Sequence, residues 1–300
     1  MSAPPPITVV MRTKDSAWVV DRALAGLFSQ ARTDFALLVV DSGSKDATLD
    51  IVGRYPCKLI RIAAEKYYPG AVLNDALATV ESETIVFQNS DVVPLASDAL
   101  DWLVAPLVDR RVVATFARQV PRPEAHAWVR RDYDVAFPAH GDAPLFMTYS
   151  LPFAAMRRSA WRTRPFYTDA WGSEDTEWGA WAKRAGHLVR YVPEAIVMHS
   201  HNYTLRQLWG RRFIEGEADA YIKRDRATVS GAIVRAVRSI ARDARADLAA
   251  GDLRSLIATP ARRAVYHAAH LQGHRLGEHR IATGSNDASI GQREVLKRYG

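Results

Sequence analysis

A chain of 300 residues with 48% hydrophobic and 24% charged side chains has a globular composition, which excludes wholesale disorder. Its single cysteine excludes an internal disulfide framework, and its apolar stretches are too short to span a bilayer. The net charge of +7 belongs to the C-terminal third, because residues 201–300 hold 18 Lys and Arg against 10 Asp and Glu. This balance indicates a polyanionic partner, either membrane headgroups or nucleic acid.

The first residues contain neither the basic nor the apolar segment of a signal peptide, so we expect the protein in the cytoplasm. A reducing compartment also suits a chain with one cysteine, Cys57. Because Cys57 begins the apolar run 57–62, we expect a buried structural thiol rather than a reactive one.

The first 120 residues alternate short apolar runs with segments of helical periodicity. We predict strands over residues 7–11, 35–40, 57–62, 84–88 and 112–116. We predict helices over residues 17–30, 46–54, 71–80 and 97–108, the first of them capped by Asp15 and Ser16. Such alternation is typical of βαβ units and indicates an α/β fold, with helices on both faces of a mostly parallel sheet.

The rest of the chain is less regular at first and then helical. We expect a loop-rich segment over 121–144, a helix over 174–185, and strands over 153–156, 188–192 and 195–199 on either side of Pro193. Further helices are predicted over about 204–225, 229–249 and 253–272. We therefore divide the chain into an α/β domain over 1–203, a helical region over 204–282 and a mobile tail over 283–300.

Three polar clusters follow predicted strands directly, at residues 12–15, 41–46 and 89–91. In open parallel sheets, ligands bind beyond the carboxyl ends of the strands, so we expect these clusters to meet at a site. Asp41 can accept hydrogen bonds from a base or a ribose, and a capped strand–helix turn is the equal alternative. Oxygens of the 89–91 turn can ligate Mg²⁺ or Mn²⁺, whereas an Asx turn before Pro94 is the plain alternative.

Two further clusters lie downstream. Glu174, Asp175 and Glu177 crowd the start of a predicted helix, where the helix dipole favours acids whatever their function. Adjacent carboxylates in a cleft can also supply a general base. His199 and His201 alternate at the end of a predicted strand, which points both imidazoles to one face. One of them could ligate a metal, although a lone histidine is more often structural.

Taken in order and spacing, these clusters resemble glycosyltransferase family 2, which has a GT-A fold. The resemblance covers about residues 7–203 and rests on the Val-Val-Asp-Ser-Gly-Ser-Lys-Asp run at 39–46, the 89–91 turn, the Glu-Asp pair at 174–175 and the later histidine. Residues 68–74 and 191–204 look like the rhamnosyltransferase-like branch, which acts on surface polysaccharides and typically uses dTDP-rhamnose.

The resemblance implies an inverting, metal-assisted transfer of a sugar from a dTDP-, UDP- or GDP-linked donor to a hydroxyl of a glycan or lipid-linked acceptor. The donor-binding residues it implies are Thr13, Asp41, Ser90 and Asp91, in a nucleotide-binding half over about 7–119. Asp91 and His199 would hold Mn²⁺ or Mg²⁺.

In an acceptor half over about 120–203, the resemblance implies Asp175 as general base and Glu174 as a residue that shapes the acceptor pocket. The family usually has Asp where this chain has Asn89. Asn keeps an oxygen but loses a charge, so we expect the site to bind a metal still, but more weakly. The same departure leaves a non-catalytic nucleotide-sugar-binding module as the alternative function.

The basic C-terminal third contains an amphipathic helix over 229–248. One side carries Val229, Ile233, Val237, Ile240, Ala244 and Leu248, and another carries Arg235, Arg238, Arg242 and Arg245. Either the apolar side faces the core and the arginines are solvated, or the helix contacts anionic lipid at the inner face of the cell membrane. We find no zinc-finger spacing and no RNA-recognition signature, so nucleic acid is not the expected partner.

Overall fold

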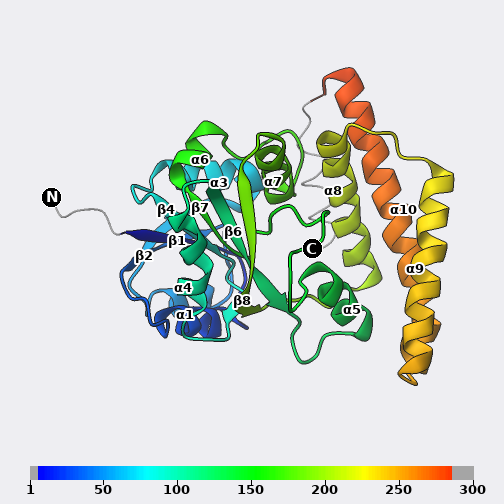
Figure 1. Ribbon diagram of the computed structural model, residues 1–300, viewed down its shortest axis with the longest axis horizontal. Helices are drawn as coiled ribbons and strands as arrows, with labels where there is room; N and C mark the ends of the chain where they lie inside the picture. Colours follow the sequence, from blue (N-terminus) through cyan, green and yellow to red (C-terminus); the bar gives the residue numbers. More distant parts are fainter. Residues whose placement is uncertain (1–5, 286–300) are drawn as a thin grey trace.

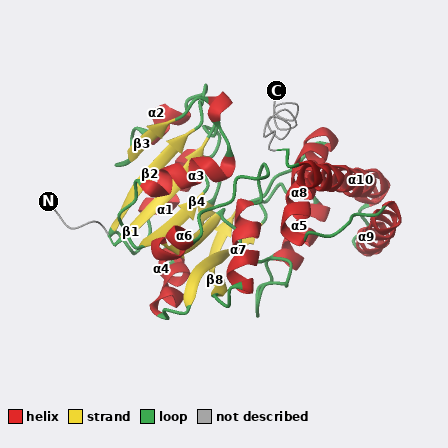
Figure 2. Ribbon diagram, turned by 90° about the horizontal axis from the view of Figure 1, so that it is seen from above, coloured by secondary structure: helices red, strands yellow, loops and turns green. Residues whose placement is uncertain are grey.

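The fold is an eight-stranded mixed sheet with helices on both faces, joined to a group of long C-terminal helices. This is a computed structural model, and it describes residues 6–285 (Figure 1). The expected α/β architecture with a C-terminal helical extension is confirmed. The sheet and the C-terminal helices lie at opposite ends of the molecule (Figures 1 and 2).

The strands follow one another in the spatial order β3-β2-β1-β4-β7-β6-β8-β5. The pairs that join β3, β2, β1 and β4 are parallel, as is β6 with β8, whereas β7 and β5 are antiparallel to their neighbours. The strands are β1 (Ile7–Thr13), β2 (Phe35–Asp41), β3 (Lys58–Arg61), β4 (Thr84–Gln88), β5 (Val93–Pro94), β6 (Val112–Val120), β7 (Phe153–Arg157) and β8 (Leu188–Met198).

Helices cover the two faces of this sheet and then extend beyond it. Those of the sheet domain are α1 (Val20–Phe28), α2 (Thr48–Val52), α3 (Pro69–Ala78), α4 (Ala99–Val104), α5 (Ala127–Ala136), α6 (Arg158–Thr163) and α7 (Glu174–Arg184), with single 3₁₀ turns at Ala64–Lys66 and Ala105–Val108. The C-terminal helices are α8 (Leu205–Lys223), α9 (Val229–Ala249) and α10 (Leu253–Thr283).

Burial on both faces explains why the strands read as continuous apolar runs. Along β1, Val9 and Met11 point into one core, and Val10 points into the other. Successive side chains of a strand alternate between faces, so a strand covered by helices on both sides needs apolar residues at every position. Chain order reverses at β1, which has β2 on one side and β4 on the other. This reversal opens the crevice beyond the ends of these strands.

The structure corrects several local expectations. The segment expected to be loop-rich contains the ten-residue helix α5. The two strands expected around Pro193 form the single strand β8, in which a register shift against β6 falls at residues 193–195 and accommodates the proline. The expected caps, Asp15 and Ser16, do not cap α1, which begins at Val20 without a side-chain cap. Cys57 is half-buried rather than buried, and burial raises the pKa of its thiol.

The C-terminal helices pack by close backbone contact. α8 and α10 cross where a Cβ on Gly216 would overlap the carbonyl of His270, and one on Gly273 would overlap the carbonyl of Phe213. α10 extends to Thr283, eleven residues beyond its expected end, and most of the expected mobile tail lies outside the described residues. Within residues 6–285, none of the helices combines the length and apolar character that crossing a membrane requires.

Candidate active site

A cavity of about 450 Å³ lies between the sheet domain and the C-terminal helices. The predicted site residues Glu174, Asp175 and His199 line it. Thr13 and Ser90 lie at the ends of the adjacent strands β1 and β4, and Asp41 pairs in register with Thr13 at the end of β2. The three strand-end residues are buried beside the cavity rather than on its wall.

Asp91, His199 and His201 form a cluster whose potential ligand atoms all lie within 4.8 Å of one another. The Nε2 atoms of His199 and His201 lie 3.5 and 3.2 Å from Asp91 Oδ2. His201 thus joins the two residues implied as metal ligands. The alternation of the two histidines at a strand end was the signal for this third member.

Hydrogen bonds behind His199 orient its ring. Gln119 donates its Nε2 hydrogen to Ser150 Oγ at 2.9 Å, so Gln119 Oε1 is an acceptor. His199 Nδ1 lies 2.7 Å from that oxygen and therefore donates to it. This assignment leaves the lone pair of His199 Nε2 facing Asp91, which is the arrangement of a metal-ligating histidine held by its other nitrogen.

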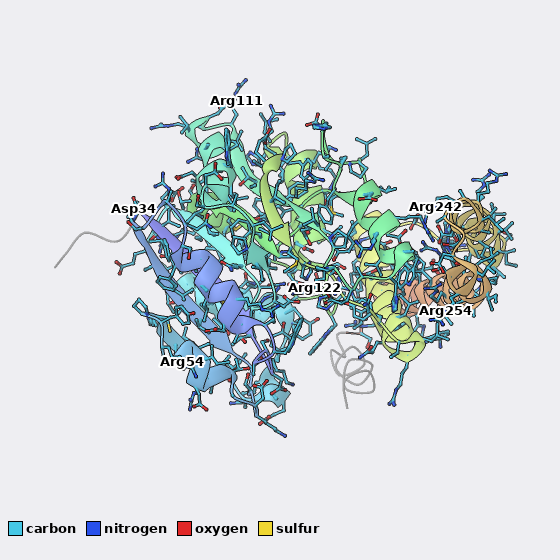
Figure 3. The ribbon with its side chains drawn as sticks, turned by 90° about the horizontal axis from the view of Figure 1, so that it is seen from below. Asp34, Arg54, Arg111, Arg122, Arg242 and Arg254 are labelled. Atoms are coloured by element: carbon cyan, nitrogen blue, oxygen red, sulfur yellow. The ribbon has the colours of Figure 1, made fainter. Side chains whose placement is uncertain are left out.

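Electrostatics favour the ligating forms of Asp91 and His201. Burial opposes the charge on Asp91, but His199, His201 and Arg122 outweigh it and hold the pKa of Asp91 well below its usual range. Burial and the neighbouring His199 lower the pKa of His201 to about 4, so its imidazole is neutral near pH 7. Arg122 also donates to the main-chain oxygen of Asp91 and lies near the middle of the molecule (Figure 3).

The loops after β1, β2 and β4 are tied together by their own side chains. Ser90 Oγ lies 2.8 Å from Ser16 Oγ. The Asp41 carboxylate accepts hydrogen bonds from the main-chain N–H groups of Gly43 and Ser44, at 3.0 and 3.1 Å. In this structure Asp41 therefore stabilises its own turn, which is the structural alternative raised by its sequence. Thr13 Oγ1 is buried without a hydrogen-bond partner among the described residues.

Buried charged side chains cluster at the start of α7. Arg12 Nη1 lies 2.8 Å from Glu174 Oε1, and both side chains are mostly buried. Asp175 accepts hydrogen bonds from the main-chain N–H of Leu151 at 3.0 Å and of Thr176 at 2.7 Å. Burial and the adjacent Glu174 raise the pKa of Asp175 above its usual range. A buried carboxylate with a raised pKa is suited to accept a proton.

Arg12 was predicted only as a member of the polar cluster at residues 12–15, without a role of its own. The signal for it was a charged side chain at the end of an otherwise apolar strand, since arginine is rarely buried unless it is paired. The pairing of Arg12 with Glu174 could not be recognised from the sequence, because 162 positions separate the two residues.

The far wall of the cavity comes from α5, α8 and α10. Arg211 Nε lies 2.6 Å from Glu215 Oε1, and Arg212 pairs with the same carboxylate. The Arg212 guanidinium also lies 3.8 Å from the centre of the Tyr266 ring on α10. Asp132 of α5 completes this side. The C-terminal helices are thus part of the site and not only an appendage to it.

Comparison with known proteins gives three kinds of match. The profile of glycosyl transferase family 2 matches residues 8–164. The O-antigen chain rhamnosyltransferase RfbN of Salmonella typhimurium is 30% identical over 253 residues, covering 78% of this chain and 79% of that protein. The O-antigen chain rhamnosyltransferase WbaN of Salmonella anatum is 32% identical over 222 residues, covering 68% and 69%.

Solved structures with low sequence identity share the fold. A mannosyltransferase from Pyrobaculum calidifontis, solved with GDP-mannose and Mn²⁺, is 19% identical with a TM-score of 0.59, covering 98% of this chain and 81% of that one. TarS of S. aureus, residues 1–349, is 15% identical with a TM-score of 0.53, covering 93% and 92%.

Proposed function

The chain belongs to glycosyl transferase family 2, and from this premise we propose that it transfers rhamnose from dTDP-rhamnose, with inversion, to a hydroxyl of a glycan or lipid-linked acceptor. It is a nucleotide-sugar-dependent glycosyltransferase of the rhamnosyltransferase-like branch. The observation that carries the proposal is one cavity lined by both the candidate base Asp175 and the paired histidines His199 and His201.

We assign Asp91, His199 and His201 as the residues that would hold a divalent cation. One carboxylate and two imidazole nitrogens suit Mn²⁺ better than Mg²⁺, which prefers oxygen ligands. When bound, such a cation would offset the negative charge of the leaving diphosphate. Asn89 lines the same cavity, and the three members of the cluster supply their ligand atoms without a carboxylate at that position.

We assign Asp175 as the general base. Its carboxylate would take the proton of the acceptor hydroxyl as the hydroxyl oxygen forms its bond to the anomeric carbon. The bond from that carbon to the diphosphate breaks at the same time, and the nucleoside diphosphate leaves. Arg12 would neutralise Glu174 and so keep a second negative charge from raising the pKa of Asp175 further.

The donor nucleotide would bind at the strand ends, against Thr13, Asp41 and Ser90. We propose a catalytic unit over residues 1–203, with a donor half over about 7–119 and an acceptor half over about 120–203, and helices over 204–282 that complete the acceptor side. We also propose that the protein works at the cytoplasmic face of an anionic membrane, where a lipid-linked acceptor would be presented.

A thermal-shift screen of dTDP-, UDP- and GDP-sugars, with and without Mn²⁺, tests the donor and the metal together. A ligand that binds only the native state raises the melting temperature. We expect dTDP-rhamnose with Mn²⁺ to give the largest rise, and His201→Ala to lose the part that depends on Mn²⁺. A larger rise with a UDP- or GDP-sugar would overturn the donor assignment, and a rise independent of Mn²⁺ would overturn the metal assignment.

A further inference from the structure

Helix α9 is packed with its apolar side outward. Its exposed apolar residues are 46–61% accessible and comprise Val229, Ile233, Val234, Val237 and Leu248. At its junction with α10, Leu253 and Ile257 are 64% and 80% accessible. The buried residues of α9 are Ala232, Asp243 and Asp247. The interpretation in which the apolar side of this helix faces the core is therefore wrong.

Ion pairs explain this inverted packing. Asp243 lies 2.7 Å from Arg263 of α10, and Asp247 lies 2.8 Å from Arg131 of α5. Thr259 of α10 donates a further hydrogen bond to Asp247 at 3.0 Å. Buried carboxylates need such partners, so the side of α9 that carries Asp243 and Asp247 must face α5 and α10. The apolar side is left at the surface as a result.

The exposed apolar residues lie along α9 and at its junction with α10. Val229, Ile233 and Val237 are four positions apart and share a face of the helix. We call this strip the α9–α10 edge and define it as Val229, Ile233, Val237, Leu248, Leu253 and Ile257. It lies at the outer end of the molecule, away from the sheet (Figures 1 and 2). A row of exposed apolar side chains of this kind is a candidate interaction site.

Arginines border the α9–α10 edge, and one of them, Arg242, is paired with Asp132 and Asp243. Arg238 and Arg245 follow Val237 and Ala244 by one position, which places them beside the strip. From residue 229 to residue 265, five arginines are exposed and all three aspartates are buried or half-buried. Two of the five, Arg242 and Arg254, are seen at this end of the molecule in Figure 3. The exposed charged side chains of this segment are thus all arginines.

We propose that the α9–α10 edge docks on an anionic lipid surface, with its aliphatic side chains at the headgroup–acyl boundary and its arginines among the headgroups. An apolar strip flanked by Lys or Arg is the pattern of helices that lie in a membrane interface. A second copy of the chain is the less suitable occupant, because association through this edge would bring two sets of arginines together without acids between them.

The docked edge would be continuous with the wall of the active site. Asp132 lines the cavity, and its Oδ1 atom lies 2.9 Å from Arg242 of α9 and 2.8 Å from Arg263 of α10. When the α9–α10 edge is docked on lipid, it would therefore hold the acceptor side of the cavity near the membrane. This positioning role of the α9–α10 edge rests on the proposed transfer to a lipid-linked acceptor. Lipid binding itself can be measured without any turnover.

Vesicle flotation with the purified full chain tests the proposal. We expect binding to vesicles that contain phosphatidylglycerol and weak binding to pure phosphatidylcholine. Ile233→Gln with Val237→Gln removes apolar area from exposed positions without removing a buried contact, and should weaken binding roughly a hundredfold. The matched control is Val108→Gln with Leu95→Gln, two exposed apolar residues of the sheet domain, which should bind as the unaltered protein does.

Arg238→Gln with Arg245→Gln tests the electrostatic part, and should weaken binding about 25-fold, at about fivefold for each arginine. Equal binding by the Ile233→Gln, Val237→Gln protein and its control would overturn the proposal. So would a dimer in analytical ultracentrifugation that these two substitutions convert to a monomer, without lipid binding by either form. Because the assay contains neither donor nor acceptor, its failure would leave the transferase reaction standing.

Discussion

The sheet domain and the C-terminal helices bury different kinds of side chain. The central strands are enclosed by aliphatic side chains, and Val9, Met11 and Val39 are fully buried. The core-facing positions of α9 and α10 include Asp243, Asp247 and Arg263 instead. Burial of apolar area stabilises the first region, and paired charges specify the packing of the second. The candidate active site lies between them and takes buried charged residues from the sheet domain and arginines from the C-terminal helices.

The largest effect is expected from a buried charge in the sheet domain that serves catalysis. Asp175→Asn should lower kcat by about 10²- to 10⁴-fold, because the amide cannot accept the acceptor proton. The pKa of Asp175 is raised in the folded state, so ionisation of this carboxylate above that pKa opposes folding. Thermal unfolding at pH 8 should therefore show a melting temperature that is unchanged or higher. A variant that retained full transfer activity would remove Asp175 from the base role.

The second effect contrasts the loss of a buried charge with the loss of a buried leucine side chain. Asp243→Ala should lower the free energy of unfolding by about 1.5–3 kcal/mol, because it removes one of the two carboxylates that pair with the buried Arg263 and leaves only Asp132. Leu24→Ala in the sheet domain should cost about 2–5 kcal/mol through its cavity.

The two losses should differ in how they can be rescued. Adding Arg263→Met to Asp243→Leu should recover most of the stability in urea unfolding, since an apolar pair can replace a buried ion pair. Failure of this double substitution to exceed Asp243→Ala in stability would show that the charges are not the reason for the inverted packing.

A smaller effect is expected where α8 and α10 touch through glycine. Gly273→Ala should lower the free energy of unfolding by about 1–3 kcal/mol, because the new methyl group meets the backbone of α8. In an open helix the same change would be favourable, since alanine is the better helix former. The reverse change at an exposed position of the same helix, Ala268→Gly, should cost about 0.5–1 kcal/mol and serves as the control. Stabilisation by Gly273→Ala would contradict the close contact.

The smallest effect concerns the pH dependence of stability and the contact between Ser239 of α9 and His267 of α10. His267 Nε2 lies 3.0 Å from Ser239 Oγ, and burial together with nearby arginines lowers the pKa of His267 from 6.5 to about 4. Between these two values the unfolded chain binds the proton more readily than the folded one, so stability should fall as pH falls. Urea unfolding at pH 7 and pH 5 should show a smaller difference for His267→Gln. An equal difference in both proteins would place the acid sensitivity elsewhere.

The two regions also differ in how far the sequence predicts them. Apolar runs located β1, β2 and β4 to within a residue or two, because burial on both faces requires aliphatic residues at every position. The bounds of α9 were also predicted, but its orientation was not. Amphipathic periodicity places the apolar side inward by default, and long-range pairs such as Asp247 with Arg131 leave no mark on that periodicity.

The candidate site shows the same division. Polar residues at strand ends pointed to Asp91, and the alternating histidines pointed to His199. The pairing of Arg12 with Glu174 depends on contacts between distant segments and could not be read from either one. The ten-residue helix α5, expected as loop, supplies Asp132 to the same cavity.

The most direct test of the central claim is release of dTDP from dTDP-rhamnose in the presence of a glycan acceptor, measured with Mn²⁺ and with chelator. We expect turnover that chelator abolishes and Mn²⁺ restores, and that Asp91→Asn reduces by orders of magnitude because it removes the charged member of the Asp91, His199 and His201 cluster. Turnover that survives both chelator and Asp91→Asn would contradict a metal-assisted reaction at this cluster.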